Sequence, residues 1–108
     1  MLNLSMRNEY EELKVLIKLS SLDSQKAVSQ DMGIALGKVN YIVKALIEKG
    51  FVKMGNFVNE DDKKRYRYLL TPEGIENKIN ATKKFVAIKK EEYEMLQREL
   101  EQHESKAK

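Results

Sequence analysis

The last third of the chain contains no helix breaker, since neither proline nor glycine occurs between Ile75 and Glu104. A continuous helix of roughly 30 residues is about 45 Å long, which exceeds the width of a small domain. It must therefore project from the domain or pack on something outside it. The 108 residues are expected to divide into one compact domain, residues 1–74, and a long helical element, residues 75–108, with a frayed tail from Glu104.

A stripe of mostly apolar residues follows this predicted helix. Positions spaced alternately by four and three residues are Ile75, Ile79, Thr82, Val86, Lys89, Tyr93, Leu96, Leu100 and His103. This spacing is typical of a coiled-coil face, which Lys89 interrupts. Phe85, Ile88 and Met95 widen the stripe, as expected of a helix that packs on more than one neighbour. We predict dimerisation through Ile75, Ile79, Val86, Tyr93, Leu96 and Leu100.

Three shorter helices are predicted in the first half of the chain. The first spans residues 7–20, with Tyr10, Leu13, Leu16, Ile17 and Ser20 at helical spacing. The second begins after Ser24, a good N-cap, and ends at Gly33, because glycine readily adopts the left-handed conformation found after helices. The third spans residues 36–49 and ends at Gly50, and its predicted buried residues are Val39, Ile42, Val43, Leu46 and Ile47.

Two short runs rich in β-branched and aromatic residues follow, at residues 51–58 and 66–70. The charged residues 59–65 separate them, so the pattern predicts a β-hairpin with a polar tip. Thr71 and Pro72 then suit the N-cap and first position of the long helix, and Glu73 faces the positive end of its dipole. The fold class is therefore mainly α with a small β-hairpin wing (α+β), in the element order of a winged helix-turn-helix with a long C-terminal dimerisation helix.

The residues around Gly33 satisfy the stricter spacing of a helix-turn-helix unit. Val28 and Met32 precede the glycine at the core spacings, Ile34 follows it, and Val39 and Ile42 supply the inward face of the next helix. Ser29 stands where only a small side chain fits between the two helices. A generic helical hairpin would not impose all of these constraints.

The excess positive charge is confined to the segment that contains this unit. The formal net charge is +3, and residues 24–71 carry 9 basic and 5 acidic side chains, whereas residues 1–23 carry 3 and 4 and residues 72–108 carry 8 and 8. Basic charge gathered in one segment favours a surface that binds a polyanion, because neutralised phosphates release counterions. A solvated basic face is the alternative interpretation.

The sequence resembles the MarR type of winged-helix regulator, and most closely the short branch associated with exopolysaccharide gene clusters. The resemblance covers roughly residues 10–100 and is carried by residues 24–34, 37–41, 46–52 and 68–74, including the leucine-threonine-proline-x-glycine step that ends at Gly74. Ala35 departs from the pattern, which often has a serine N-cap there. The wing also departs from it, because Asp61 and Asp62 precede Lys63, Lys64 and Arg65 where an aspartate and paired arginines are common.

This resemblance implies a homodimer that binds double-stranded DNA, with the third helix in the major groove and the wing on adjacent backbone or in the minor groove. Asn40 is a candidate reader of adenine and Lys38 a candidate contact to guanine or phosphate, while Tyr41 and Lys44 suit backbone contacts. Gly37 permits close approach, and Ser24 and Gln25 begin a helix whose N–H groups suit a phosphate. The full predicted set is Ser24, Gln25, Leu36, Gly37, Lys38, Asn40, Tyr41, Lys44, Lys63, Lys64 and Arg65.

Other function classes find little support. The chain has no cysteine and one histidine, and the run Glu60, Asp61, Asp62 matches no metal-site spacing, so we expect no metal site and no cofactor. Neither a signal peptide nor a membrane span is predicted, which suggests a cytoplasmic protein. No catalytic set or phosphate loop occurs, so we expect no enzyme. A winged helix that docks on a protein partner through the long helix is the main alternative, and RNA or single-stranded DNA binding is a weaker one. Nothing in the sequence identifies an effector.

Overall fold

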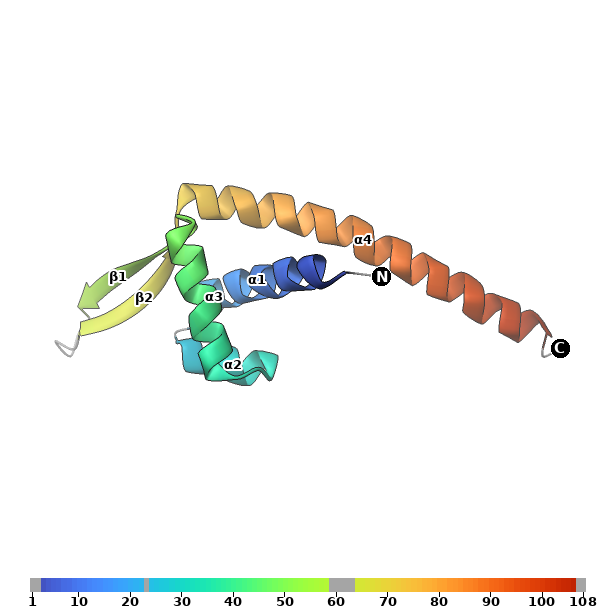
Figure 1. Cartoon of the computed structure of the whole chain (residues 1–108), viewed down its shortest axis with the longest axis horizontal. Helices are drawn as coiled ribbons and strands as arrows, with labels where there is room; N and C mark the ends of the chain where they lie inside the picture. The colour runs from blue at the N-terminus through green and yellow to red at the C-terminus, as the bar shows by residue number, and fades with distance from the viewer. Residues whose placement is uncertain (1–2, 23, 59–63, 107–108) are drawn as a thin grey trace.

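The computed structural model describes residues 3–22, 24–58 and 64–106, and it has the predicted order of elements (Figure 1). The helices are α1 (Leu4–Ser21), α2 (Gln25–Met32), α3 (Leu36–Glu48) and α4 (Pro72–Lys106). Strands β1 (Val52–Val58) and β2 (Lys64–Leu70) form one antiparallel hairpin. The prediction of a mainly helical winged helix-turn-helix with a long last helix is confirmed.

Side chains and glycines at the helix ends explain most of these boundaries. Ser24 accepts a hydrogen bond from the Ala27 N–H at 3.1 Å, and Gly33 ends α2 in the left-handed conformation with φ 66°, as predicted. Helix α1 begins three residues earlier than predicted, because the side chain of Asn3 caps it by accepting from the Met6 N–H at 2.9 Å. Gly50, with φ 77°, turns the chain after α3.

The core lies where α1, α2, α3 and the start of the hairpin meet. Its buried side chains are Val15, Leu16, Leu19, Val28, Val39, Ile42, Val43, Leu46 and Val52. The core predicted for α3 is confirmed except at Ile47, which is 38% exposed and lies outside the buried cluster.

The predicted inward face of α1 needs a larger correction. Ser20 is exposed and its hydroxyl donates to the Leu16 carbonyl at 3.3 Å, whereas Val15 and Leu19, which the periodicity did not select, are buried. The reason is that α1 contacts α2, α3, α4 and β2, so more than one face of the helix is covered.

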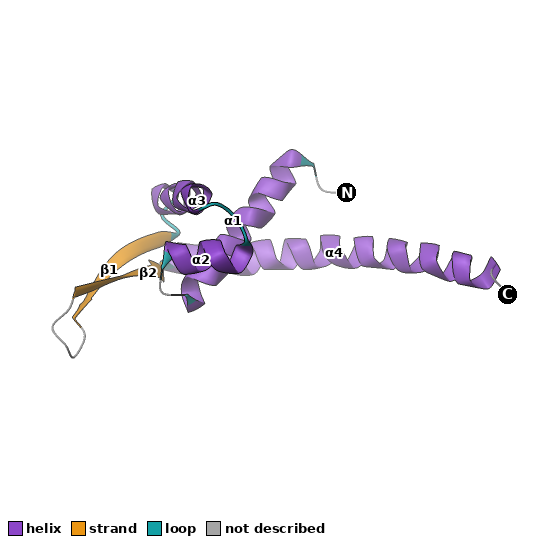
Figure 2. Cartoon of the chain, turned by 90° about the horizontal axis from the view of Figure 1, so that it is seen from below, coloured by secondary structure: helices purple, strands orange, loops and turns teal. Residues whose placement is uncertain are grey.

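The hairpin register is fixed from its base. Val52 pairs with Leu70, Met54 with Tyr68 and Val58 with Lys64. Because side chains alternate between the two faces of a strand, Val52 points into the core while Lys53 points to solvent. The two views show the hairpin extending from one end of the molecule and α4 from the other (Figures 1 and 2).

The start of α4 is hydrogen-bonded to, and closely packed against, the segment that follows α3. The Thr71 N–H donates to the Phe51 carbonyl at 3.0 Å, and the Thr71 hydroxyl donates to the Gly50 carbonyl while accepting from the Gly74 N–H. The predicted N-cap role of Thr71 is confirmed. Gly74 is buried so close to Phe51 that a β-carbon would lie 2.0 Å from the Phe51 carbonyl oxygen.

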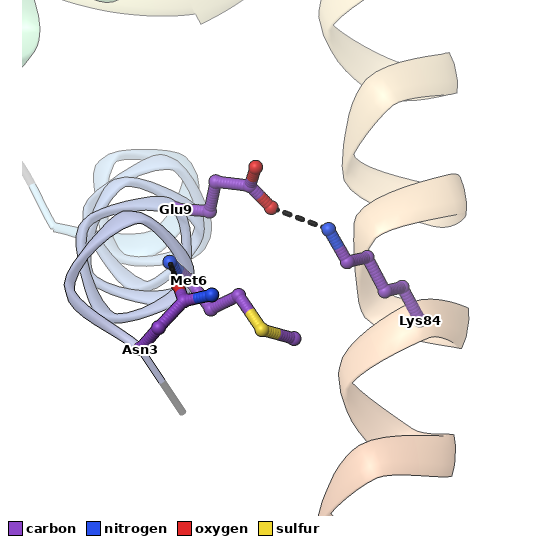
Figure 3. A network of polar contacts seen from close by, with 4 residues as sticks. All are labelled: Asn3, Met6, Glu9 and Lys84. Carbon is purple, nitrogen blue, oxygen red and sulfur yellow. Dashed lines mark hydrogen bonds and ion pairs between the residues drawn. The ribbon is translucent and has the colours of Figure 1, made fainter. Parts of the chain in front are cut away.

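Helix α1 crosses the first half of α4, and the second half of α4 projects from the rest of the molecule (Figures 1 and 2). Phe85 is buried against Tyr10, with ring centroids 4.9 Å apart, and the Lys84 ammonium lies 2.6 Å from the Glu9 carboxylate (Figure 3). The molecule measures 68 × 25 × 24 Å as a result. No helix within the described residues combines the length and the apolar character that crossing a bilayer requires.

Candidate nucleic-acid interface

Helix α3 presents one side to solvent. It buries Val39, Ile42, Val43 and Leu46, and at about 100° per residue the opposite side carries Gly37, Tyr41 and Lys44. The Tyr41 side chain is 75% exposed. The helix N-terminus is also open, because Ala35 occupies the N-cap and makes no side-chain hydrogen bond. A helix of this kind has the width to enter the DNA major groove.

The turn between α2 and α3 sets the position of this exposed face. The Ser29 hydroxyl donates to the Ile34 carbonyl at 2.6 Å, and the Ile34 N–H donates to the Ser29 carbonyl at 3.2 Å. Ser29 was selected by its size alone, and the structure adds that its hydroxyl fastens the turn. The angle between α2 and α3 is therefore held by these two hydrogen bonds as well as by the packing of Val28.

Five of the predicted contact residues meet around one open hollow of about 590 Å³. It lies between the start of α2, the start of α3 and the base of the wing, and its lining consists of Ser24, Gln25, Lys26, Leu36, Gly37, Asn40 and Tyr68. The Gln25 side-chain amide donates to the Tyr68 hydroxyl at 2.8 Å, which ties α2 to β2. The Tyr68 hydroxyl accepts this bond and so keeps its own proton for another acceptor.

Lys38 and Tyr41 lie on the other flank of α3, beside α1. Together with Glu11 they line a second groove, between α1 and α3, and the Lys38 ammonium lies 3.0 Å from the Glu11 carboxylate. The Lys38 side chain is 54% exposed, and ion pairs this exposed contribute about 0–1 kcal/mol. Lys38 can therefore exchange Glu11 for a phosphate at little cost.

The remaining predicted contacts lie in the wing and on α3. Lys44 is exposed on α3. Lys63 lies outside the described residues, as do Glu60, Asp61 and Asp62, while the backbone of Lys64 and Arg65 belongs to β2 and their side chains are outside the description. Within the part of the chain that is described, no three histidine, cysteine or acidic residues are grouped as a metal site would require.

The sequence analysis missed Lys26, Tyr68 and Glu11. Lys26 follows Gln25 in the first turn of α2, and its basic charge next to two selected residues was a usable signal. Tyr68 and Glu11 reach the site only through the tertiary fold, since Gln25 and Tyr68 are 43 positions apart.

The residues predicted to dimerise lie on one exposed face of α4. Ile75, Ile79, Val86, Tyr93, Leu96 and Leu100 are each 49–64% exposed. Phe85 faces α1 instead and is buried. Lys89, which interrupts the stripe, extends toward α1, with its ammonium 4.8 Å from the centre of the Tyr10 ring and 3.6 Å from the Glu92 carboxylate.

Comparison with known proteins agrees with this geometry. A family model for winged helix-turn-helix DNA-binding domains matches residues 24–53, from the cap of α2 to the start of β1. Residues 24–53 are therefore similar to winged helix-turn-helix DNA-binding domains, and the fold of the described residues is that of a winged helix-turn-helix. No curated protein matches the sequence.

Two solved structures show how far the similarity extends. A MarR/EmrR family transcriptional regulator from Acinetobacter sp. ADP1 superposes with a TM-score of 0.64 and 27% identity, over 78% of this chain and 59% of that one. A mutant of MepR from S. aureus, bound to an oligodeoxyribonucleotide, superposes with a TM-score of 0.57 and 19% identity, over 91% of this chain and 78% of that one. The second likeness concerns the fold alone. The chain thus spans less than two thirds of the Acinetobacter regulator.

Proposed function

We propose that the protein is a transcriptional regulator of the MarR type that binds a specific double-stranded DNA site as a homodimer. The observation that carries the proposal is the uncovered face of α3, bounded by the start of α2 on one flank and by the base of the wing. The winged helix-turn-helix match over residues 24–53 and the basic excess of residues 24–71 support it.

In this proposal the residues divide by role. Asn40, at the mouth of the hollow, offers the amide that recognises adenine through two hydrogen bonds. Ser24, Gln25, Tyr41 and Lys44 contact the phosphate backbone and set the register of α3, as do Lys63, Lys64 and Arg65 in the wing. Leu36 and Gly37 lie where the helix start approaches the bases.

Lys38 adds affinity in two steps, because it leaves Glu11 when a phosphate or guanine is within reach. Ile75, Ile79, Val86, Tyr93, Leu96 and Leu100 join two copies, so that two recognition helices read a pseudo-palindromic site. The resemblance to the exopolysaccharide-associated branch makes promoters of polysaccharide genes, after the protein's own upstream region, the first DNA to test.

Fluorescence anisotropy of the full chain on its own upstream DNA and on a scrambled duplex, across salt, tests the proposal. We expect tighter binding to the upstream DNA that weakens steeply with salt. Asn40→Ala should remove about 1–3 kcal/mol of the preference for the specific duplex. Lys38→Ala should weaken binding to both duplexes and lower the salt slope by about one unit.

Lys106→Ala, at the far end of α4, is the matched control because it removes the same charge away from α3. It should bind like the unmodified protein. Equal, weak binding to both duplexes that neither α3 variant changes would contradict the proposal and would favour the protein-docking alternative instead.

A further inference from the structure

We infer that α4 pairs with the α4 of a second copy in antiparallel orientation, about a two-fold axis between Ala87 and Ile88. The inference rests on the proposed homodimer and specifies its geometry. The face concerned is the exposed stripe of α4, which α1 leaves uncovered because Phe85 and Lys84 engage α1 from an adjacent side of the helix.

Charge along α4 is strongly asymmetric. Residues 72–90 carry five lysines and two glutamates, whereas residues 91–106 carry six glutamates against one arginine and one lysine. In a parallel pair, basic half would face basic half and acidic half would face acidic half. In an antiparallel pair, each basic half faces an acidic half. Helix α4 is therefore complementary in charge to a second α4 that runs in the opposite direction. This self-complementarity selects a second copy as the occupant of the stripe.

The charged residues that flank the stripe also favour the antiparallel orientation when they are considered one by one. Lys78 and Glu99 each stand one position before a stripe residue, Ile79 and Leu100 respectively, so they flank the stripe on the same side. In a parallel coiled coil such a residue faces the one five positions later on the partner. Lys78 would then face Lys83, and Glu99 would face Glu104.

In the antiparallel register Lys78 of each copy faces Glu99 of the other. Among the flanking residues, this register has one like-charged pair, Lys83 opposite Lys90. The parallel register has two like-charged pairs, Lys78 opposite Lys83 and Glu99 opposite Glu104, and no oppositely charged pair.

The stripe itself also fits the antiparallel register. Centred between Ala87 and Ile88, it places Ile75 against Leu100, Ile79 against Leu96, Thr82 against Tyr93 and Val86 against Lys89. A parallel pair would instead place Lys89 opposite Lys89 in the middle of the seam. Antiparallel pairing places Lys89 beside the apolar Val86 of the second copy. The Lys89 ammonium points away from the seam, toward the Tyr10 ring and the Glu92 carboxylate.

Distances between labels attached to single cysteines test the orientation, and the chain has no cysteine of its own. His103→Cys is the informative variant, because antiparallel pairing separates the two labels by about 46 Å and parallel pairing by about 10 Å, at 1.5 Å per residue and normal interhelical spacing. Ala87→Cys is the matched control, since its labels stay close in either orientation. On the full chain, with dimer mass established by sedimentation, double electron–electron resonance measures the long distance and dipolar broadening of the continuous-wave spectrum detects a short one.

A long distance at position 103 with a short one at position 87 supports the inference. A short distance at position 103 in an intact dimer overturns the orientation and leaves the proposed DNA-binding dimer standing. A monomer at all accessible concentrations overturns both the inference and the dimeric part of the proposed function, while DNA binding is judged separately by anisotropy.

Reversing the charge of Lys78 is an independent test, because the two orientations predict opposite changes in the dimer dissociation constant. Lys78→Glu should raise the dimer dissociation constant about tenfold, because two exposed ion pairs become repulsive. Adding Glu99→Lys in the same chain should restore it. A parallel dimer would respond in the reverse way, with Lys78→Glu tightening the dimer by removing its repulsion with Lys83, and that result would overturn the inference.

Discussion

Replacing Gly74 by alanine should destabilise the protein, although alanine is normally the better helix former. The new β-carbon would lie 2.0 Å from the Phe51 carbonyl oxygen and 2.8 Å from its carbonyl carbon. Both atoms are backbone, so no side-chain rotation relieves the contact. The start of α4 and the segment after α3 would have to separate by more than an ångström, which strains the Thr71 bonds to Phe51 and Gly50.

The expected net cost is about 2 kcal/mol. Overpacking of this kind costs about 1–3 kcal/mol, and weakening the Thr71 bonds adds about 1 kcal/mol. The higher helix propensity of alanine offsets at most about 1 kcal/mol of this cost. For a domain of this size the melting temperature should fall by roughly 10 °C.

Thermal and urea denaturation at one fixed protein concentration measure this effect, because the proposed dimerisation would make stability depend on concentration. Gly37→Ala is the matched control, since nothing lies within 4 Å of its β-carbon position in α3. It should leave the fold unchanged or stabilise it by up to about 1 kcal/mol. If Gly74→Ala were as stable as Gly37→Ala, the argument that α4 is locked onto Phe51 would be wrong.

Three further substitutions have defined outcomes. Ala35→Ser supplies the missing N-cap of α3 and should raise the free energy of unfolding by about 0.5–1 kcal/mol in urea titrations, and an unchanged midpoint would count against an uncapped α3. Tyr68→Phe removes the hydroxyl that accepts the hydrogen bond from Gln25. Affinity for the specific duplex should fall severalfold in anisotropy titrations, while the melting temperature stays within a few degrees. Unaltered affinity would show that Tyr68 is not part of the interface. Glu11→Gln releases Lys38 and removes a negative charge beside α3, so affinity for any duplex should rise severalfold at low salt, and weaker binding would show that Glu11 positions Lys38 instead of restraining it.

Local signals in the sequence were enough to predict most of the fold. Ser24, Gly33, Thr71 and Gly50 act at helix ends through bonds and dihedral angles that depend on the residue type and its nearest neighbours. Helix α3 was predicted almost to the residue because a single face of it is buried. Helix α1 was not, since neighbours on several sides bury Val15 and Leu19, and periodicity detects one face only.

The candidate site was only partly accessible to the same reasoning. The exposed positions of α3 follow from its buried ones, so Asn40, Tyr41 and Lys44 could be selected from the sequence. The contacts that modulate the site join distant segments, as Tyr68 does with Gln25 and Glu11 with Lys38. Such pairs depend on the angles between elements, which local sequence patterns do not encode.

Backbone amide NMR of the full chain, recorded while its upstream duplex is added, tests the central claim most directly. We predict that the largest shifts fall on residues 36–44 of α3, on residues 24–26 at the start of α2 and near Tyr68 at the base of the wing, while residues 93–106 of α4 change little. Shifts confined to the stripe of α4, or the same small shifts with a scrambled duplex, would contradict the assignment of this surface as a sequence-reading DNA interface.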